Sequence, residues 1–188
     1  MHMRVGSIIG VCLFLTMVPS SVFAQELAAQ TENSYQLPYP GVLPGQTLYP
    51  FKEIKESLQG FFIADPYQKA VFSLEQAEKY MQGAYLLFFA KEHSKENLTA
   101  TLKKAAFYSQ ETFGLSQDAS KQGKDGHIVI DRLLHLLEKQ EELLDSMLAN
   151  TPVVNKEEQT IVQEYKKSAL SLRVSIYKYQ VLQKKKSL

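Results

Sequence analysis

The chain has 188 residues, of which 45% are hydrophobic and 22% charged, and its formal net charge is +1 at pH 7. This length and apolar content suffice for one domain with its own hydrophobic core. A charge so close to zero gives no general attraction to the phosphates of a nucleic acid, so we expect no nucleic-acid partner.

Residues 1–24 have the pattern of a secretory signal peptide. Arg4 precedes an apolar run, Val5–Val18, and Val22 and Ala24 stand at the positions that precede a cleavage site. The run has about 14 residues, fewer than the roughly 20 that span a bilayer. We therefore predict cleavage after Ala24.

Cleavage is expected to leave a mature terminus at Gln25 and an extracytoplasmic product, located in the periplasm, at the cell surface or secreted. Cys12, the single cysteine, leaves with the signal, so the mature chain has no disulfide or thiolate metal site. The position of cleavage can be measured from the intact mass of protein exported by its host. The alternative is that Val5–Ala24, taken whole, stays as an anchor; a chain that keeps Met1 in the membrane fraction contradicts cleavage. No segment after the signal is apolar for long enough to span a membrane.

A spacer and a proline-rich segment come next. Residues 25–34 are polar, lack an apolar period and are predicted to be disordered. Residues 35–50 are expected to be extended and to lie over another part of the domain, because proline repeatedly fixes φ and removes a backbone donor. The prolines are Pro38, Pro40, Pro44 and Pro50, and the apolar side chains available for contact are Tyr39, Leu43, Leu48 and Tyr49.

This segment carries a family resemblance. It reads Leu-Pro-Tyr-Pro-Gly-x-Leu-Pro from Leu37 and Leu-Tyr-Pro-x-Lys from Leu48, and Asp65-Pro66 then opens a long helical pattern. Together these features resemble the bacterial domain of unknown function 5667. The resemblance covers roughly Leu37 to the helix predicted over Ile128–Asn150. It implies an extracytoplasmic helical domain and supplies no activity.

Residues 51–188 are predicted to form a helical bundle domain. A short helix with Pro50 at its first position has Ile54, Leu58 and Phe61 or Phe62 on one side. The next helix begins at the cap Asp65 and reaches about His93. A third runs from about Lys95 to Phe113, where Gly114 closes it, and Leu115–Gly126 is a polar, mobile loop.

Two further helices complete the domain. Ile128–Asn150 carries apolar residues over about half its circumference, so it needs two neighbours and is predicted to be central. The last helix starts with a capping-box-like Asn155 and Glu158 and continues to about Lys184. No stretch has the period of a strand. The fold class is therefore all-α: an antiparallel bundle of four long helices plus a short leading helix. The expected inner stripe of the last helix is Ile161, Tyr165, Ala169, Leu172, Ile176 and Tyr179.

One set of residues has the spacing of metal ligands. Histidines four residues apart on a helix can share a metal ion with carboxylates of the same face. These residues lie opposite the apolar side of the predicted Ile128–Asn150 helix, so a solvated polar face is the favoured interpretation and a weak divalent-metal site is the alternative. The set consists of His127, Asp131, His135 and Glu138.

The last helix has a second apolar stripe on the side opposite its inner one. Either the helix is sandwiched between two others, or its outer face is an interface with a partner or a second copy. The stripe consists of Leu170, Val174, Tyr177 and Val181. Beyond it, Lys184, Lys185 and Lys186 are a solubilising end or make weak contact with an anionic envelope surface.

No motif of an enzyme or of a phosphate-binding loop occurs, and no cofactor is expected. The leading hypothesis is an exported, non-enzymatic helical protein that acts through protein binding or assembly at the cell envelope. The alternative is a small-molecule or metal-binding helical bundle in the periplasm.

Overall fold

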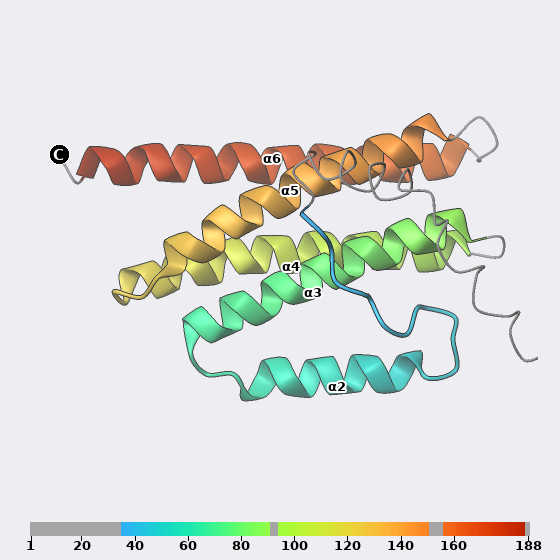
Figure 1. The fold of residues 1–188 in the computed structure, drawn as a ribbon, viewed down its shortest axis with the longest axis horizontal. Coiled ribbons are helices and arrows are strands. Elements are labelled where there is room, and N and C mark those ends of the chain that lie inside the picture. The colour runs from blue at the N-terminus through green and yellow to red at the C-terminus, as the bar shows by residue number, and fades with distance from the viewer. Residues whose placement is uncertain (1–34, 91–93, 151–155, 187–188) are drawn as a thin grey trace, which may run out of the picture. The chain divides into compact units, whose positions relative to one another are not determined.

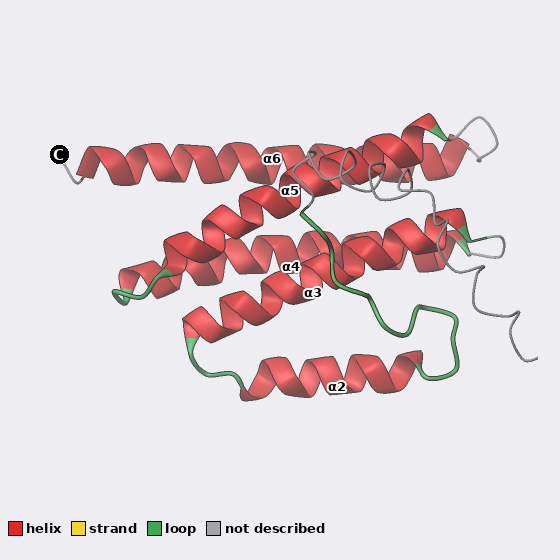
Figure 2. Cartoon of the chain, viewed as in Figure 1, coloured by secondary structure: helices red, strands yellow, loops and turns green. Residues whose placement is uncertain are grey.

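The computed structural model describes residues 35–90, 94–150 and 156–186, and this part of the chain contains five helices and no strand (Figures 1 and 2). The signal peptide and the spacer lie outside the described residues, as do His93 and Asn155. Residues from Tyr35 onward form one compact unit. The helices are α2 (Tyr49–Phe62), α3 (Pro66–Phe89), α4 (Lys95–Lys121), α5 (Gly126–Ala149) and α6 (Lys156–Lys186).

The long helices α3 to α6 form an antiparallel bundle, and the predicted all-α fold is confirmed (Figure 1). The contact between α3 and α4 is the most extensive, and α6 packs against α5 and α4. Both α4 and α5 contact all three other long helices, so α5 has the two neighbours that its wide apolar side was predicted to need, but it is not the single central helix. The short helix α2 contacts α3.

Local capping fixes where two of the helices begin. The Asp65 carboxylate accepts a hydrogen bond from the Gln68 amide at 3.0 Å, and Pro66 takes the first helical position of α3. An ion pair with Lys124 and the bond from Gln68 hold the pKa of Asp65 below its usual range. Ser94 caps α4 by accepting from the amide of Asn97 at 3.1 Å.

The prediction that Gly114 ends a helix is wrong, because α4 continues through it to Lys121. Ser116 and Ala119 are buried and continue the inner face of α4. The cap glycine is Gly123, whose φ is 74°. Its amide donates to Ser120, and the next amide donates to Ala119, which is the pattern of a Schellman ending. The mobile loop expected over residues 115–126 is therefore a turn of four residues, 122–125.

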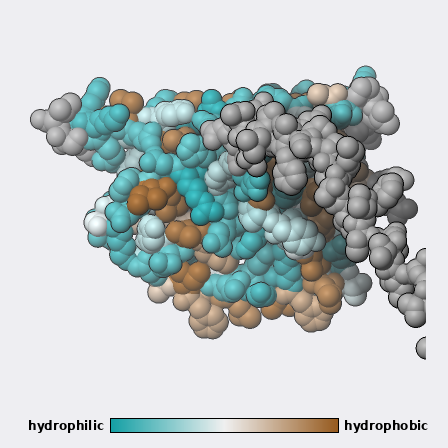
Figure 3. Space-filling model, viewed as in Figure 1, coloured by the Kyte–Doolittle hydropathy of each residue, from teal (hydrophilic) through white to brown (hydrophobic). Residues whose placement is uncertain are grey.

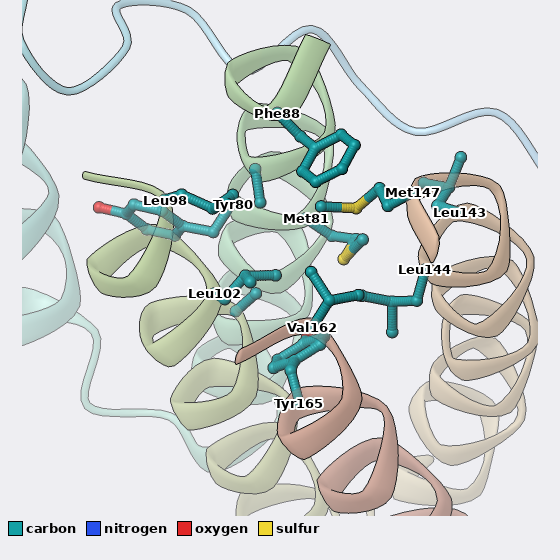
Figure 4. Close-up of a cluster of buried hydrophobic side chains, with 12 residues drawn as sticks. Tyr80, Met81, Phe88, Leu98, Leu102, Leu143, Leu144, Met147, Val162 and Tyr165 are labelled. Carbon is teal, nitrogen blue, oxygen red and sulfur yellow. The ribbon is translucent and has the colours of Figure 1, made fainter. Parts of the chain in front are cut away.

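The core consists of two groups of buried side chains, and α5 contributes to both. In the first group, shown in Figure 4, Met81 of α3, Leu102 of α4 and Leu144 of α5 meet Val162 of α6. The second group joins α3, α5 and α6 around Leu133. The predicted inner stripe of α6 packs against these two groups along its length: Tyr165 and Ile176 are buried, and Ile161, Ala169, Leu172 and Tyr179 are partly buried. Val162, which the predicted stripe did not include, is buried as well.

The proline-rich segment follows the prediction in part. It is free of helix from Tyr35 to Leu48 and lies on the bundle, where Leu37 packs against both core groups and Pro40 is buried. Two expectations are wrong, since Tyr39 and Leu48 are exposed rather than packed. Turns close the segment before α2, which begins at Tyr49 rather than at residue 50 or 51.

Candidate functional site

The second apolar stripe of α6 is exposed in the described structure. The exposed fractions are 36% for Leu170, 51% for Val174, 43% for Tyr177 and 54% for Val181. Val174, Tyr177 and Val181 line a shallow groove together with Leu182, itself exposed. Among the described helices none covers the stripe, so α6 is an edge helix and is not sandwiched between two others.

Polar contacts on the inner side of α6 fix which way the stripe faces. The Arg173 guanidinium donates from Nη1 to Oε2 of Glu141 on α5 at 2.7 Å. The Lys166 ammonium lies 2.5 Å from Oδ1 of Asp145, also on α5. Together with buried Ile176, these contacts set the rotation of α6 about its axis and direct the stripe away from the bundle.

The four predicted metal ligands fall into two pairs and do not form one group. His127, Asp131, His135 and Glu138 all lie exposed on α5. His127 and Asp131 line a shallow groove that Lys124 and Lys184 also line, and these cations oppose a metal ion. His135 instead lies 3.6 Å from Glu138, and Asp131 accepts a hydrogen bond from Gln180 at 3.2 Å. In the described ranges, no three His, Cys, Asp or Glu side chains are grouped so that they can hold a metal.

The polar end of α6 is exposed as well. Lys184 and Lys185 lie exposed in its last turn, and Lys186 is its final residue. Exposed lysines of this kind suit either a solubilising end or weak contact with an anionic surface. Among the described helices, none is long and apolar enough to cross a bilayer.

The short helix α2 packs on the bundle through its polar side. Glu56, on that side, is buried and accepts a hydrogen bond from the Tyr80 hydroxyl at 2.6 Å. The Lys52 ammonium donates to the carbonyl of Pro40 at 2.7 Å and lies 5.3 Å from the centre of the Tyr80 ring. Burial, then the Glu56 carboxylate, raises the pKa of Tyr80, so this hydroxyl stays a donor.

A lysine of α4 completes this contact. Lys104 forms an ion pair with Glu53 of α2, and its ammonium lies 5.4 Å from the centre of the Tyr49 ring. We call the set Lys52, Glu53, Glu56, Tyr80 and Lys104 the polar interlayer. It joins α2 to α3 and α4 through hydrogen bonds and charges, where helix packing ordinarily uses apolar side chains.

The apolar side of α2 consequently faces outward. The residues that the sequence places on one side, Ile54, Leu58, Phe61 and Phe62, do share a side, and all four are exposed together with Phe51. Figure 3 shows apolar atoms gathered along the lower edge of the molecule, where α2 lies in Figure 1. We call these five residues the α2 apolar face. The sequence pattern predicted one side with Ile54, Leu58 and Phe61 or Phe62. It did not include Phe51, and it did not indicate that this side faces outward.

A buried ion pair holds the proline-rich segment to the bundle. The Arg132 guanidinium of α5 donates to both carboxylate oxygens of Glu78 on α3, at 3.1 and 2.9 Å, and Glu78 is almost fully buried. The Tyr35 hydroxyl donates to the same carboxylate. Burial, then the hydrogen bond to Glu78, raises the pKa of Tyr35, so this donor stays protonated at neutral pH. The network is structural, because each of its groups is satisfied within the protein.

The interior of the bundle contains a small pocket between α4, α5 and α6. It is lined by Ser109, Gln140 and Tyr165 among others, and its volume is about 10 Å³. This is the space of about one water molecule. The pocket is therefore too small for an organic ligand. The Gln140 side-chain carbonyl and the Tyr165 hydroxyl, which line it, are buried without a hydrogen-bond partner among the described residues.

Comparison of the chain with protein-family models, with curated proteins and with solved structures finds no match. The resemblance to domain 5667 stays a prediction.

Proposed function

We propose that this chain is an exported, non-enzymatic helical protein that acts through protein binding or assembly at the cell envelope. The observation that carries the proposal is the exposed stripe on α6. Contiguous apolar surface on a folded protein usually marks an interaction site, whereas scattered apolar residues do not. The pattern of residues 1–24 supports the extracytoplasmic location.

The spacing of the stripe favours a helix as the partner. Leu170, Val174, Tyr177 and Val181 are separated by four, three and four residues, which is the spacing of alternating core positions in a coiled coil. The valines fall at one core position and Leu170 and Tyr177 at the other, as in two-stranded pairs. We propose a second copy of the chain as the occupant, because the same seam on both copies meets this requirement.

Glutamate at both Val174 and Tyr177 is expected to abolish self-association while leaving helical content and melting temperature nearly unchanged. The charges fall in the seam, where pairing would remove them from water, but they stay solvated in the single chain. The mass in solution, measured by light scattering over a range of concentrations, gives the result.

The matched control is Ser171→Glu with Ser175→Glu. Both serines are exposed on α6, and the helix period places them beside the stripe rather than on it. This variant adds the same charge to the same helix and is expected to keep the association of the original chain. A Val174→Glu, Tyr177→Glu protein that unfolds, or that associates as before, contradicts the proposal.

The runner-up, a periplasmic bundle that binds a small molecule or a metal, gains no support from a particular contact. Metal analysis of the purified protein, beside its mass in solution, separates the two functions. A stoichiometric metal content in a monomer favours the runner-up.

A further inference from the structure

The α2 apolar face is the largest group of exposed aromatic side chains on one described helix. The exposed fractions of Phe51, Phe61 and Phe62 are 69%, 80% and 76%, and Ile54 and Leu58 lie between them with more than half of their surface exposed. An amphipathic helix on the surface of a globular protein ordinarily turns its apolar side toward the core. Here the opposite side is the packed one.

The polar interlayer holds this orientation. Rotating α2 to bury its phenylalanines would break the hydrogen bond from Tyr80 to Glu56 and the ion pair between Lys104 and Glu53. It would also remove the Lys52 ammonium from the carbonyls of Pro40 and Val42. The outward position of the apolar face is thus maintained by specific contacts.

The charges of α2 are divided between its two sides. Both glutamates of the helix, Glu53 and Glu56, point toward the bundle, where Lys104 and Tyr80 meet them. The helix period puts Lys55 at the border of the apolar face, and its side chain is exposed. The outward side therefore has a cation, Lys55, at its edge and no carboxylate from α2. This charge complements an anionic surface.

The aromatic content of the face suits a lipid surface. At about 150–250 Å² for an aromatic side chain, the three phenylalanines expose roughly 350–550 Å². Affinity for a bilayer surface grows with the apolar area immersed in it, so this much aromatic surface on one side of a single helix favours lipid as the occupant.

We propose that α2 is a lipid-binding helix that lies in the surface of a bilayer with its phenylalanines immersed. An interfacial helix needs an apolar side with aromatic residues and a polar side that stays out of the acyl chains. In this protein the bundle occupies the polar side, so the helix carries the whole domain against the membrane. This inference goes beyond the proposed function and does not rest on it, since it concerns lipid and a different helix.

The chain has no tryptophan, so one introduced tryptophan reports on its own surroundings. The test uses the chain from Gln25 onward, which includes the whole compact unit, and vesicles of phosphatidylcholine with and without phosphatidylglycerol. We expect the emission of Phe61→Trp to shift to shorter wavelength on both kinds of vesicle, and brominated lipid to quench it. The control is Leu182→Trp, an exposed position on α6, whose emission should stay unchanged.

A second experiment removes phenylalanines from the α2 apolar face and measures the loss of vesicle binding. Phe61→Ser with Phe62→Ser should weaken vesicle binding by about tenfold or more for each phenylalanine removed, with an unchanged circular dichroism spectrum. Phe89→Ser with Ile128→Ser removes exposed apolar surface from α3 and α5, outside both proposed surfaces, and should bind as the original chain does. Absent emission shifts, or equal binding by the two double variants, overturns the proposal. So does light scattering that shows the phenylalanines driving self-association without lipid.

Discussion

Leu137→Ala is expected to lower the free energy of unfolding by about 2–5 kcal/mol. Leu137 is 2% exposed and belongs to the core group that joins α3, α5 and α6. Truncation removes buried methyl groups and leaves a cavity that the surrounding helices fill only in part. Since a domain of this size has a total stability of about 5–15 kcal/mol, the loss is large. In a thermal melt it corresponds to a decrease of about 4–20 °C.

Glu138→Ala tests the assignment of helix faces on the same turn of α5. Glu138 is exposed, and its ion-pair partner is His135 at 3.6 Å, also exposed. Exposed pairs of this kind contribute at most about 1 kcal/mol. We therefore expect a melting temperature close to that of the original chain. If Glu138→Ala destabilises the protein more than Leu137→Ala does, the burial of α5 described here is wrong.

Arg132→Met is expected to lower the free energy of unfolding by about 3 kcal/mol, because it leaves the carboxylate of Glu78 buried without its cation. Removing one partner of a buried pair costs about 3–5 kcal/mol, and the lower end applies because the Arg132 side chain is nearly half-exposed. The Tyr35 hydroxyl remains as a neutral donor to Glu78 and offsets little of the lost charge. Urea unfolding, with its slope checked for constancy, gives the difference in free energy.

Lys121→Met provides the comparison. Lys121 pairs with Asp118 at 2.8 Å, but both side chains are more than half exposed, so the pair is solvated in the folded protein. We expect its loss to be barely measurable. Arg132→Lys should fall between the two variants, since lysine restores the charge without the two parallel hydrogen bonds. Equal stabilities for Arg132→Met and Lys121→Met would show that Glu78 is solvated.

The end of α4 shows why some helix boundaries were not predictable. The sequence from Gly114 has few large apolar residues, and glycine is a common helix ending, so a loop was expected. In the structure, Ser116 and Ala119 are small enough to lie against neighbouring helices. The Ser116 hydroxyl donates to the carbonyl of Thr112 within α4, which satisfies it without water. Small polar residues can thus form a buried face, and a search for apolar residues does not detect it.

The stripe on α6 shows what periodicity does predict. Because residues three and four apart share a side of a helix, the sequence alone places Leu170, Val174, Tyr177 and Val181 together. It left two arrangements open, a sandwiched helix and an exposed face. Only the positions of the other helices decide between them, and those depend on contacts between residues far apart in the chain.

The sequence by itself therefore determined the all-α class, the long helices and the grouping of apolar residues on each side of a helix. These follow from local periods and caps, which act over a few residues. The tertiary structure alone decided which way α2 faces. That orientation depends on Tyr80 and Lys104, side chains of two other helices that meet Glu56 and Glu53. No pattern within residues 49–62 specifies those partners, so the outward apolar face becomes visible only once the bundle has assembled.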